Sequence, residues 1–183
     1  MGDFVRKLAM SEYQQQKKAK PPIEETIDRY LTGEKKVRAL AFVTFLRENK
    51  MSPQWGSTDS YNVSHKNRRV CILKFGENGF QIWANTQYNE DFNAGFEEES
   101  EENKAFLRST IVHCFGCGSC KPGLGMEILG QQVTDACYNP VIRLADPDGE
   151  RLELAKKLVL LRRQAIRQGK APKVTYIAAG KRT

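Results

Sequence analysis

The chain has 183 residues, of which 40% are hydrophobic and 28% charged, and its formal net charge is +7. This length suits a single domain with a sizeable core, and the composition excludes a disordered chain. No apolar run approaches the roughly 18 residues of a transmembrane helix, and the N-terminus lacks the apolar stretch of a secretory signal, so we expect a cytoplasmic protein.

The N-terminal part is predicted to be helical. Residues 3–19 can form a helix, but much of this stretch is polar on every side, so we expect a loosely attached arm that ends at Pro21. Apolar residues at helical spacing predict two further helices, over residues 23–31 and 34–49.

The middle of the chain is predicted to form β-structure. Its composition and alternation predict strands over residues 61–65, 69–75 and 80–84. Turn signals at Lys66-Asn67 and at Gly76-Glu77-Asn78-Gly79 lie between these strands. We therefore expect a small antiparallel sheet.

The second half mixes helices with short strands. Ser100 is a good N-cap for a helix over residues 100–113, residues 126–129 and 141–144 are predicted strands, and a final helix ends near residue 168. This order of elements predicts an α+β fold, a small antiparallel sheet with packed helices and a cysteine-rich metal loop. The expected segments are an N-terminal helical arm (1–33), the α+β domain (34–168) with its metal-binding loop (113–137), and a basic C-terminal tail (169–183).

Charge is segregated along the sequence. Residues 91–102 form an acidic block, whereas the stretch from Lys156 to the end holds nine Lys or Arg residues and no acid. A basic end of this kind can meet an anionic partner. The alternative interpretation is a solvated helix face followed by a basic tail.

Three of the five cysteines, Cys114, Cys117 and Cys120, lie within seven residues, and Cys137 follows after an interval of sixteen. Two cysteines separated by two residues, with glycine beside them, can wrap a zinc ion in one tight turn. We therefore predict a structural zinc site made of these four cysteines. The fifth, Cys71, lies within a predicted strand and is expected to be a small buried apolar residue.

The cysteine cluster is also compatible with chemistry other than zinc binding. The spacing resembles part of the bacterial ferredoxin run and allows an iron–sulfur cluster, although the Cys-x-x-x-Cys-Pro continuation is missing. A redox pair of Cys117 and Cys120 lacks the strand-then-helix context of such pairs, and reduced thiols without metal are a further possibility. His113 could replace Cys114 or Cys137, but adjacent residues rarely both reach one ion, so we expect His113 beside the site or at the surface.

Catalytic motifs are missing from the sequence. There is no Gly-rich phosphate loop of known spacing and no nucleophile placed beside a base. A zinc ion closed by four thiolates also has no open position for water. The sequence therefore favours a binding module over an enzyme.

Aromatic residues interleaved with basic ones can stack on and neutralise a nucleic acid. The same side chains can instead form the core and rim of a hairpin. From this pattern we predict binding to an anionic partner, either nucleic acid or an acidic protein. The candidate partner-binding residues are Trp55, Lys66, Arg68, Arg69, Trp83, Arg162 and Arg163.

A resemblance supports the fold and the cysteine site. The stretches FLRENKMSPQW, YNVSHKNRRVCILKF, CGSCKPG and LAKKLVLLRRQAI resemble small uncharacterised bacterial proteins with a Cys-x-x-Cys-x-x-Cys cluster, and loosely the YdhG-like domains of unknown function. The resemblance covers about residues 35–167 and implies no activity. The sequence as a whole predicts a zinc-stabilised binding module, with a thiol or iron–sulfur redox protein as the alternative.

Overall fold

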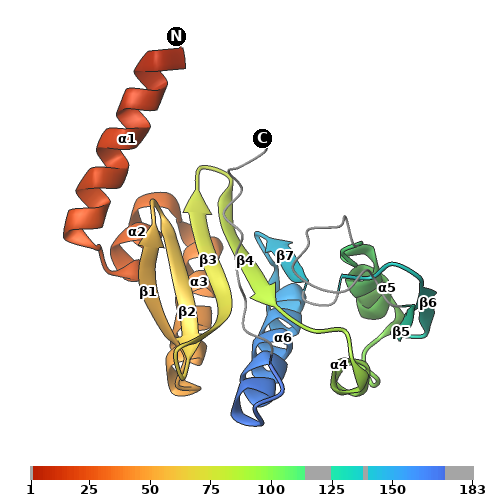
Figure 1. The fold of residues 1–183 in the computed structure, drawn as a ribbon. Helices are drawn as coiled ribbons and strands as arrows, with labels where there is room; N and C mark the ends of the chain where they lie inside the picture. Colours follow the sequence, from red (N-terminus) through yellow and green to blue (C-terminus); the bar gives the residue numbers. More distant parts are fainter. Residues whose placement is uncertain (1, 114–124, 138–139, 172–183) are drawn as a thin grey trace. The chain divides into compact units, whose positions relative to one another are not determined.

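The computed structural model describes residues 2–113, 125–137 and 140–171, and within these ranges it contains six helices and seven strands (Figure 1). The predicted α+β class is confirmed. The chain forms two compact units. Unit 1 comprises Met1–Ala84 and Arg143–Lys156, and unit 2 comprises Asn85–Ile142 and Lys157–Thr183. The predicted segment boundaries after residues 33 and 168 stay predictions.

A five-stranded antiparallel sheet of order β1-β2-β3-β4-β7 dominates unit 1. The sequence predicted three of its strands in the middle of the chain, but it missed the edge strand β1. In this strand Pro53 pairs with Val63, and the register shifts at a bulge between Trp55 and Ser57. The strands are β1 (Ser52–Ser57), β2 (Ser60–His65), β3 (Arg68–Gly76), β4 (Gly79–Asn85) and β7 (Val141–Ala145).

The register between β4 and β7 follows from two backbone hydrogen bonds at the ends of their pairing. These run from Asp146 N to Phe80 O at 2.7 Å and from Thr86 N to Pro140 O at 3.1 Å. In an antiparallel pair, one step forward on one strand is one step back on the other, so the residue numbers of partners keep a constant sum. Both hydrogen-bonded pairs have the same sum, so β4 and β7 pair without a bulge between them. Trp83 and Arg143 have this sum as well, so they lie opposite each other on neighbouring strands.

Two tight turns set the register of the central strands, and both were predicted. Lys66 and Asn67 join β2 to β3 with φ angles of 49° and 59°, the left-handed backbone that a two-residue hairpin turn requires. Gly76 pairs with Gly79 at the end of the β3–β4 hairpin. Gly79 has φ of +105°, and a Cβ there would lie 2.9 Å from Asp146 Oδ1, so glycine is required.

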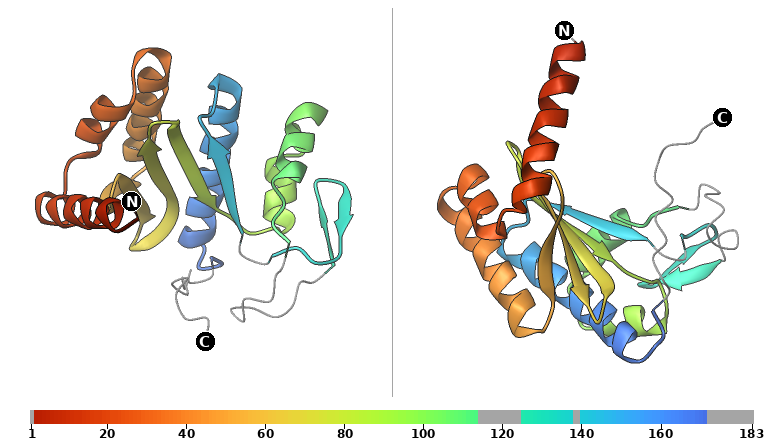
Figure 2. Two further views of the ribbon diagram at one scale, coloured as in Figure 1. Left: turned by 90° about the horizontal axis from the view of Figure 1, so that it is seen from above. Right: turned by 60° about the vertical axis from the view of Figure 1, so that its left-hand side comes forward.

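Helices α2 (Ile23–Tyr30) and α3 (Gly33–Glu48) lie together on one side of β1–β4 (Figures 1 and 2). Val37, the first apolar residue of the helix predicted over residues 34–49, is 67% exposed. The buried stripe begins two residues later, because the face at i, i+3, i+4 and i+7 is the one that turns inward. Its residues are Ala39, Phe42, Val43 and Leu46.

Helix α1 (Gly2–Ala19) is anchored through one buried glutamine. Gln16 is 6% exposed, and its Nε2 donates to Asp59 Oδ1 at 2.8 Å. The Gln16 side-chain oxygen accepts from Asp59 N at 2.9 Å and from Trp55 Nε1 at 3.3 Å. This buried side chain, together with the contact between the Tyr13 and Trp55 rings, connects α1 to the sheet.

Unit 2 is built from shorter elements. The predicted N-cap is confirmed, because Ser100 Oγ accepts from Asn103 N at 3.2 Å. The helix that follows ends at Ser109 and not at residue 113, since the Thr110 hydroxyl bonds back to Leu107 O at 2.7 Å. The acidic loop expected before this helix contains a short helix of its own. The elements are α4 (Glu90–Gly95), α5 (Glu101–Ser109), β5 (Met126–Ile128) and β6 (Gln131–Val133), with residues 157–167 of α6 (Gly149–Arg167).

An aromatic cluster forms part of the core of unit 2. Tyr88 meets Phe92 edge-on at 5.3 Å between ring centroids, and Phe92 contacts Phe96 at 5.1 Å.

Among the described residues, no helix combines the length and the apolar character needed to cross a membrane.

Candidate functional site

Of the four predicted zinc ligands, only Cys137 belongs to the described residues. Cys114, Cys117 and Cys120 lie outside them, so the predicted four-cysteine cluster itself is not described. Within the described ranges, no group of three His, Cys, Asp or Glu side chains is placed to hold a metal ion.

Cys137 nevertheless lies at the point where the cysteine segment begins. Its backbone N–H donates to Val112 O at 2.7 Å, and the next pair outward, His113 and Ala136, forms an antiparallel bridge. Cys114 follows His113 directly in the sequence. The fold of unit 2 thus places Cys137 beside Val112 and His113, the two residues that precede Cys114 in the sequence.

Tyr88 and Asp135 support this bridge. The Tyr88 hydroxyl accepts a hydrogen bond from Val112 N at 3.3 Å. Burial raises the pKa of Tyr88 to about 12, with the nearby Cys137 thiol adding to the shift. His113 Nδ1 lies 2.7 Å from Asp135 Oδ1, with both side chains largely exposed. His113 therefore directly precedes the cysteine segment in the sequence, and the Asp135 carboxylate orients its ring.

The remaining cysteine, Cys71, is fully buried in β3. Burial raises the pKa of its thiol far above the ordinary range, so the thiolate is not formed at neutral pH. The prediction of a small buried apolar residue is confirmed.

The indole ring of Trp83, on the side of the sheet away from α2 and α3, contacts two basic side chains. Lys74 Nζ lies 3.8 Å from the centroid of the indole ring, and Arg143 Cζ lies 4.1 Å from it. Burial, and then the like charge of Arg143, lower the pKa of Lys74. Within the described part of the chain, neither cation is paired with a carboxylate.

The same face of the sheet carries a continuous row of side chains. Direct cross-strand partners share a face, and the partners here run across all five strands. We call this set the outer-face row; its residues are Gln54, Asn62, Ile72, Trp83 and Arg143.

Flanking side chains extend the polar and basic character of the outer-face row. Lys74 and Gln81 face each other in the adjacent row, and Trp83 Nε1 donates to Gln81 Oε1 at 2.8 Å. On the other flank Arg69 Nη1 donates to Asn62 Oδ1 at 3.2 Å. These rows contain no Asp or Glu.

The structure divides the predicted partner-binding residues. Trp55 pairs with Tyr61 and so lies on the opposite face from Trp83, where it contacts Tyr13 of α1 at 6.0 Å between ring centroids. The other five are distributed as follows: Arg69 flanks the outer-face row, Lys66 and Arg68 lie at the β2–β3 turn, and Arg162 and Arg163 belong to unit 2.

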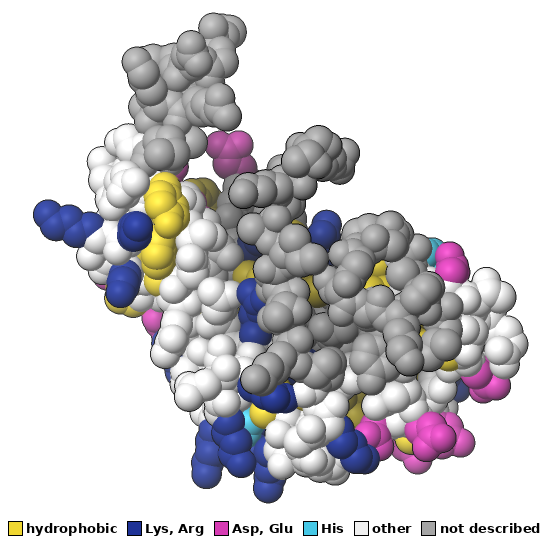
Figure 3. Space-filling model, viewed as in Figure 1, with side chains coloured by type: hydrophobic (Ala, Val, Ile, Leu, Met, Phe, Trp, Pro, Cys, Tyr) yellow, Lys and Arg dark blue, Asp and Glu magenta, His cyan; other side chains and the backbone are white. Residues whose placement is uncertain are grey.

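Lys and Arg side chains gather below β1 and β2 in Figure 3, where the β2–β3 turn lies, whereas acidic side chains gather over α4, α5, β5 and β6. The basic character predicted for this hairpin is therefore a property of the surface of unit 1. Lys74 and Arg143, which contact Trp83 directly, were missed by sequence reasoning. The register set by the β3–β4 turn was a usable signal for Lys74, but the pairing of β7 with β4 gave no local signal.

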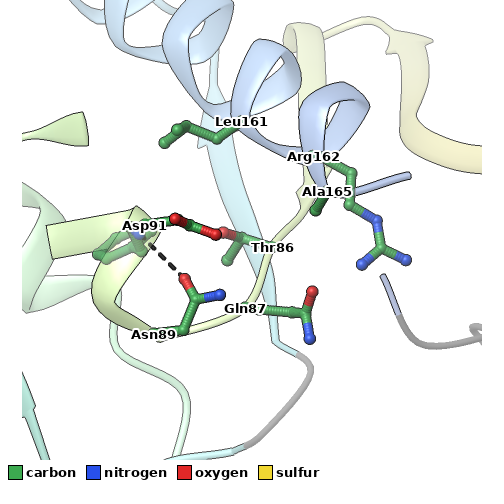
Figure 4. Close-up of a pocket in the computed structure, with 8 residues that line it drawn as sticks. Thr86, Gln87, Asn89, Asp91, Leu161, Arg162 and Ala165 are labelled. Carbon is green, nitrogen blue, oxygen red and sulfur yellow. Dashed lines mark hydrogen bonds between the residues drawn. The ribbon is translucent and has the colours of Figure 1, made fainter. Parts of the chain in front are cut away.

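Unit 2 also contains a small pocket beside α6 (Figure 4). Its volume of about 20 Å³ has room for a water molecule but not for a cofactor. Arg162, a predicted partner-binding residue, lines it and is 2% exposed. The lining residues are Thr86, Gln87, Asn89, Asp91, Phe92, Leu161, Arg162 and Ala165.

Comparisons with protein-family models, with curated proteins and with solved structures found no match to this chain. The fold class is thus defined by the arrangement of the strands and helices, and the resemblance drawn from the sequence stays a prediction.

Proposed function

We propose that this chain is a zinc-stabilised binding module for an anionic partner and that the outer face of its sheet makes the contact. The observation that carries the proposal is the pair of cations held over Trp83. Two like charges that share one indole ring repel each other, and no described carboxylate compensates them. An anion bound between Lys74 and Arg143 relieves this repulsion.

The exposure of the face also supports the proposal. Arg143 and Gln81 are exposed, and Lys74 and Trp83 are partly exposed. A bound anion can therefore reach the cations without rearrangement of the sheet. Cation–π contact holds both charged groups close to the sheet in the free protein, which reduces the side-chain entropy lost on binding.

The test is binding of inorganic polyphosphate at several salt concentrations. The variant Lys74→Gln/Arg143→Gln should weaken binding and reduce the slope of log affinity against log salt by about two. The control is Lys18→Gln/Lys20→Gln, which removes the same charge from exposed positions at the end of α1. An equal loss in both variants, or no binding by the native chain at low salt, contradicts the proposal.

The zinc part of the proposal is supported by the position of Cys137. A four-thiolate site needs the fourth cysteine close to the other three, and the hydrogen bond from Cys137 N to Val112 O brings Cys137 to the start of the cysteine segment. Zinc held there connects the ends of a 23-residue interval, between Cys114 and Cys137, and stabilises unit 2 by closing it.

Elemental analysis of protein purified without oxygen tests the metal. We expect one zinc per chain, reduced in Cys137→Ser and retained in Cys71→Ser, the matched control from the core of unit 1. Iron with sulfide contradicts the zinc assignment and favours the iron–sulfur alternative. Metal-free protein contradicts it as well and leaves thiol chemistry as the function of the cluster.

A further inference from the structure

We propose that the anionic partner is a single-stranded nucleic acid, bound across the outer-face row with a base stacked on Trp83. This inference rests on the proposed function and specifies its partner. It draws on three properties of the face: its order of side chains, its width and its position relative to the other tryptophan.

The order of side chains matches what a single strand offers. Aromatic rings stack on bases regardless of their identity, and Lys and Arg neutralise the phosphates between them. Trp83 supplies the ring, while Lys74 and Arg143 supply charges within 4.1 Å of its centroid. At the other end of the row, Gln54 and Asn62 present amides that can bond the edges of unpaired bases.

The width of the face disfavours duplex DNA. Four inter-strand steps separate β1 from β7, which at about 4.8 Å each gives about 19 Å. The major groove of duplex DNA is about 12 Å wide and admits a helix or a two-stranded ribbon. A five-stranded sheet cannot enter it face-on, and paired bases leave no free face for Trp83. A strand with splayed bases meets neither obstacle.

The chemistry of the face also disfavours an acidic peptide as the partner. Carboxylates can pair with Lys74 and Arg143, but they make no use of a partly exposed indole with a cation on it. Stacking uses the ring and the charges together, because a base takes the place of one cation on the indole and that cation moves to the phosphate.

Trp55 offers a matched control within the same sheet. It lies on the opposite face, where its Nε1 donates to Gln16 and its ring contacts Tyr13. The chain has two tryptophans, so the variant Trp55→Phe leaves Trp83 as the single indole and makes its fluorescence a direct reporter of stacking.

The experiment measures binding of oligo-dT and oligo-U 12-mers, of a 12-base-pair duplex and of inorganic polyphosphate, all at one moderate salt concentration. In the Trp55→Phe background we expect either single strand to quench Trp83 and to bind more tightly than the duplex. Trp83→Leu should weaken single-strand binding by between about fivefold and a hundredfold. Trp83→Phe should restore most of it, which separates lost stacking from a damaged sheet.

The outcomes separate the two proposals. Polyphosphate, duplex and single strand bound equally well, with Trp83→Leu unchanged, overturn the single-strand inference but leave the anionic-partner proposal intact. Binding that depends on Trp55 and not on Trp83 overturns the assignment of the face. No binding of any polyanion overturns both.

Discussion

The two units differ in the length of the helices and strands from which they are built. Unit 1 has strands of five to nine residues and a core of large apolar side chains, including Phe42, Leu73 and Phe80, which are at most 1% exposed. Apart from residues 157–167 of α6, unit 2 has strands of three residues and helices of six and nine. A unit built from such short elements gains little from its own hydrogen-bonded ladders, so it has more to gain from a metal ion. We therefore expect the proposed zinc site, if it forms, to add more to the stability of unit 2 than to that of unit 1.

Metal removal is the most direct test of this difference. Chelation should raise the hydrogen-exchange rate of the Cys137 amide, bonded to Val112 O, by at least about tenfold, because opening the metal site frees this bridge. The Leu73 amide, in the centre of β3, should keep its protection. Equal loss at both amides means that the units unfold together.

Truncation of the core of unit 1 should give the largest change in the free energy of unfolding. Phe42 is 0% exposed, so Phe42→Ala should lower the free energy of unfolding by about 3–5 kcal/mol. Tryptophan fluorescence during urea unfolding measures this, since both tryptophans belong to unit 1. Val37→Ala on the same helix, at a position that is 67% exposed, should change it by less than about 0.5 kcal/mol.

The attachment of α1 gives an intermediate effect. Gln16→Ala removes the acceptor of the Asp59 backbone N–H and one of the donors to the Asp59 carboxylate, which keeps Tyr30 and Arg29. This should cost about 1–3 kcal/mol in the same urea experiment. The neighbouring exposed Gln15→Ala is the control. A negligible effect in both variants supports the loosely attached arm that the sequence suggested.

A surface ion pair of unit 1 gives the smallest effect. The Arg47 guanidinium bonds to Glu24 and lowers the pKa of that carboxyl below its ordinary 4.5. A depressed folded-state pKa contributes stability above pH 4.5 that is lost as the pH falls through the folded value. Arg47→Met should therefore cost a few tenths of a kcal/mol, about 0.3, at pH 7, and the difference from the native chain should vanish in acid. A difference that persists at pH 2 indicates lost packing and not lost charge.

The features of the fold that were predicted correctly are those determined by residues close together in the sequence. The β2–β3 and β3–β4 turns, the Ser100 cap and the burial of Cys71 follow from a few neighbouring residues, and all were predicted correctly. The edge strand β1 was missed because Ser52-Pro53-Gln54 shows neither alternation nor β-branched residues.

The same distinction applies to the candidate sites. The basic, aromatic hairpin was visible in the sequence, but the five candidate residues on or beside it were treated as one surface. Which face each side chain occupies depends on strand pairing, and this separates Trp55 from Trp83. Arg143 comes beside Trp83 through a pairing between strands sixty residues apart, which no local pattern contains.

The edge strand β1 bears on whether a second molecule could add a strand to this sheet. An exposed edge presents unpaired backbone groups on which a second molecule can add a strand. Here Pro53 removes one N–H donor from the edge, and the bulge between Trp55 and Ser57 interrupts the regular spacing that a further strand needs. Aggregation through this edge is thereby discouraged by the residues that made the strand hard to recognise.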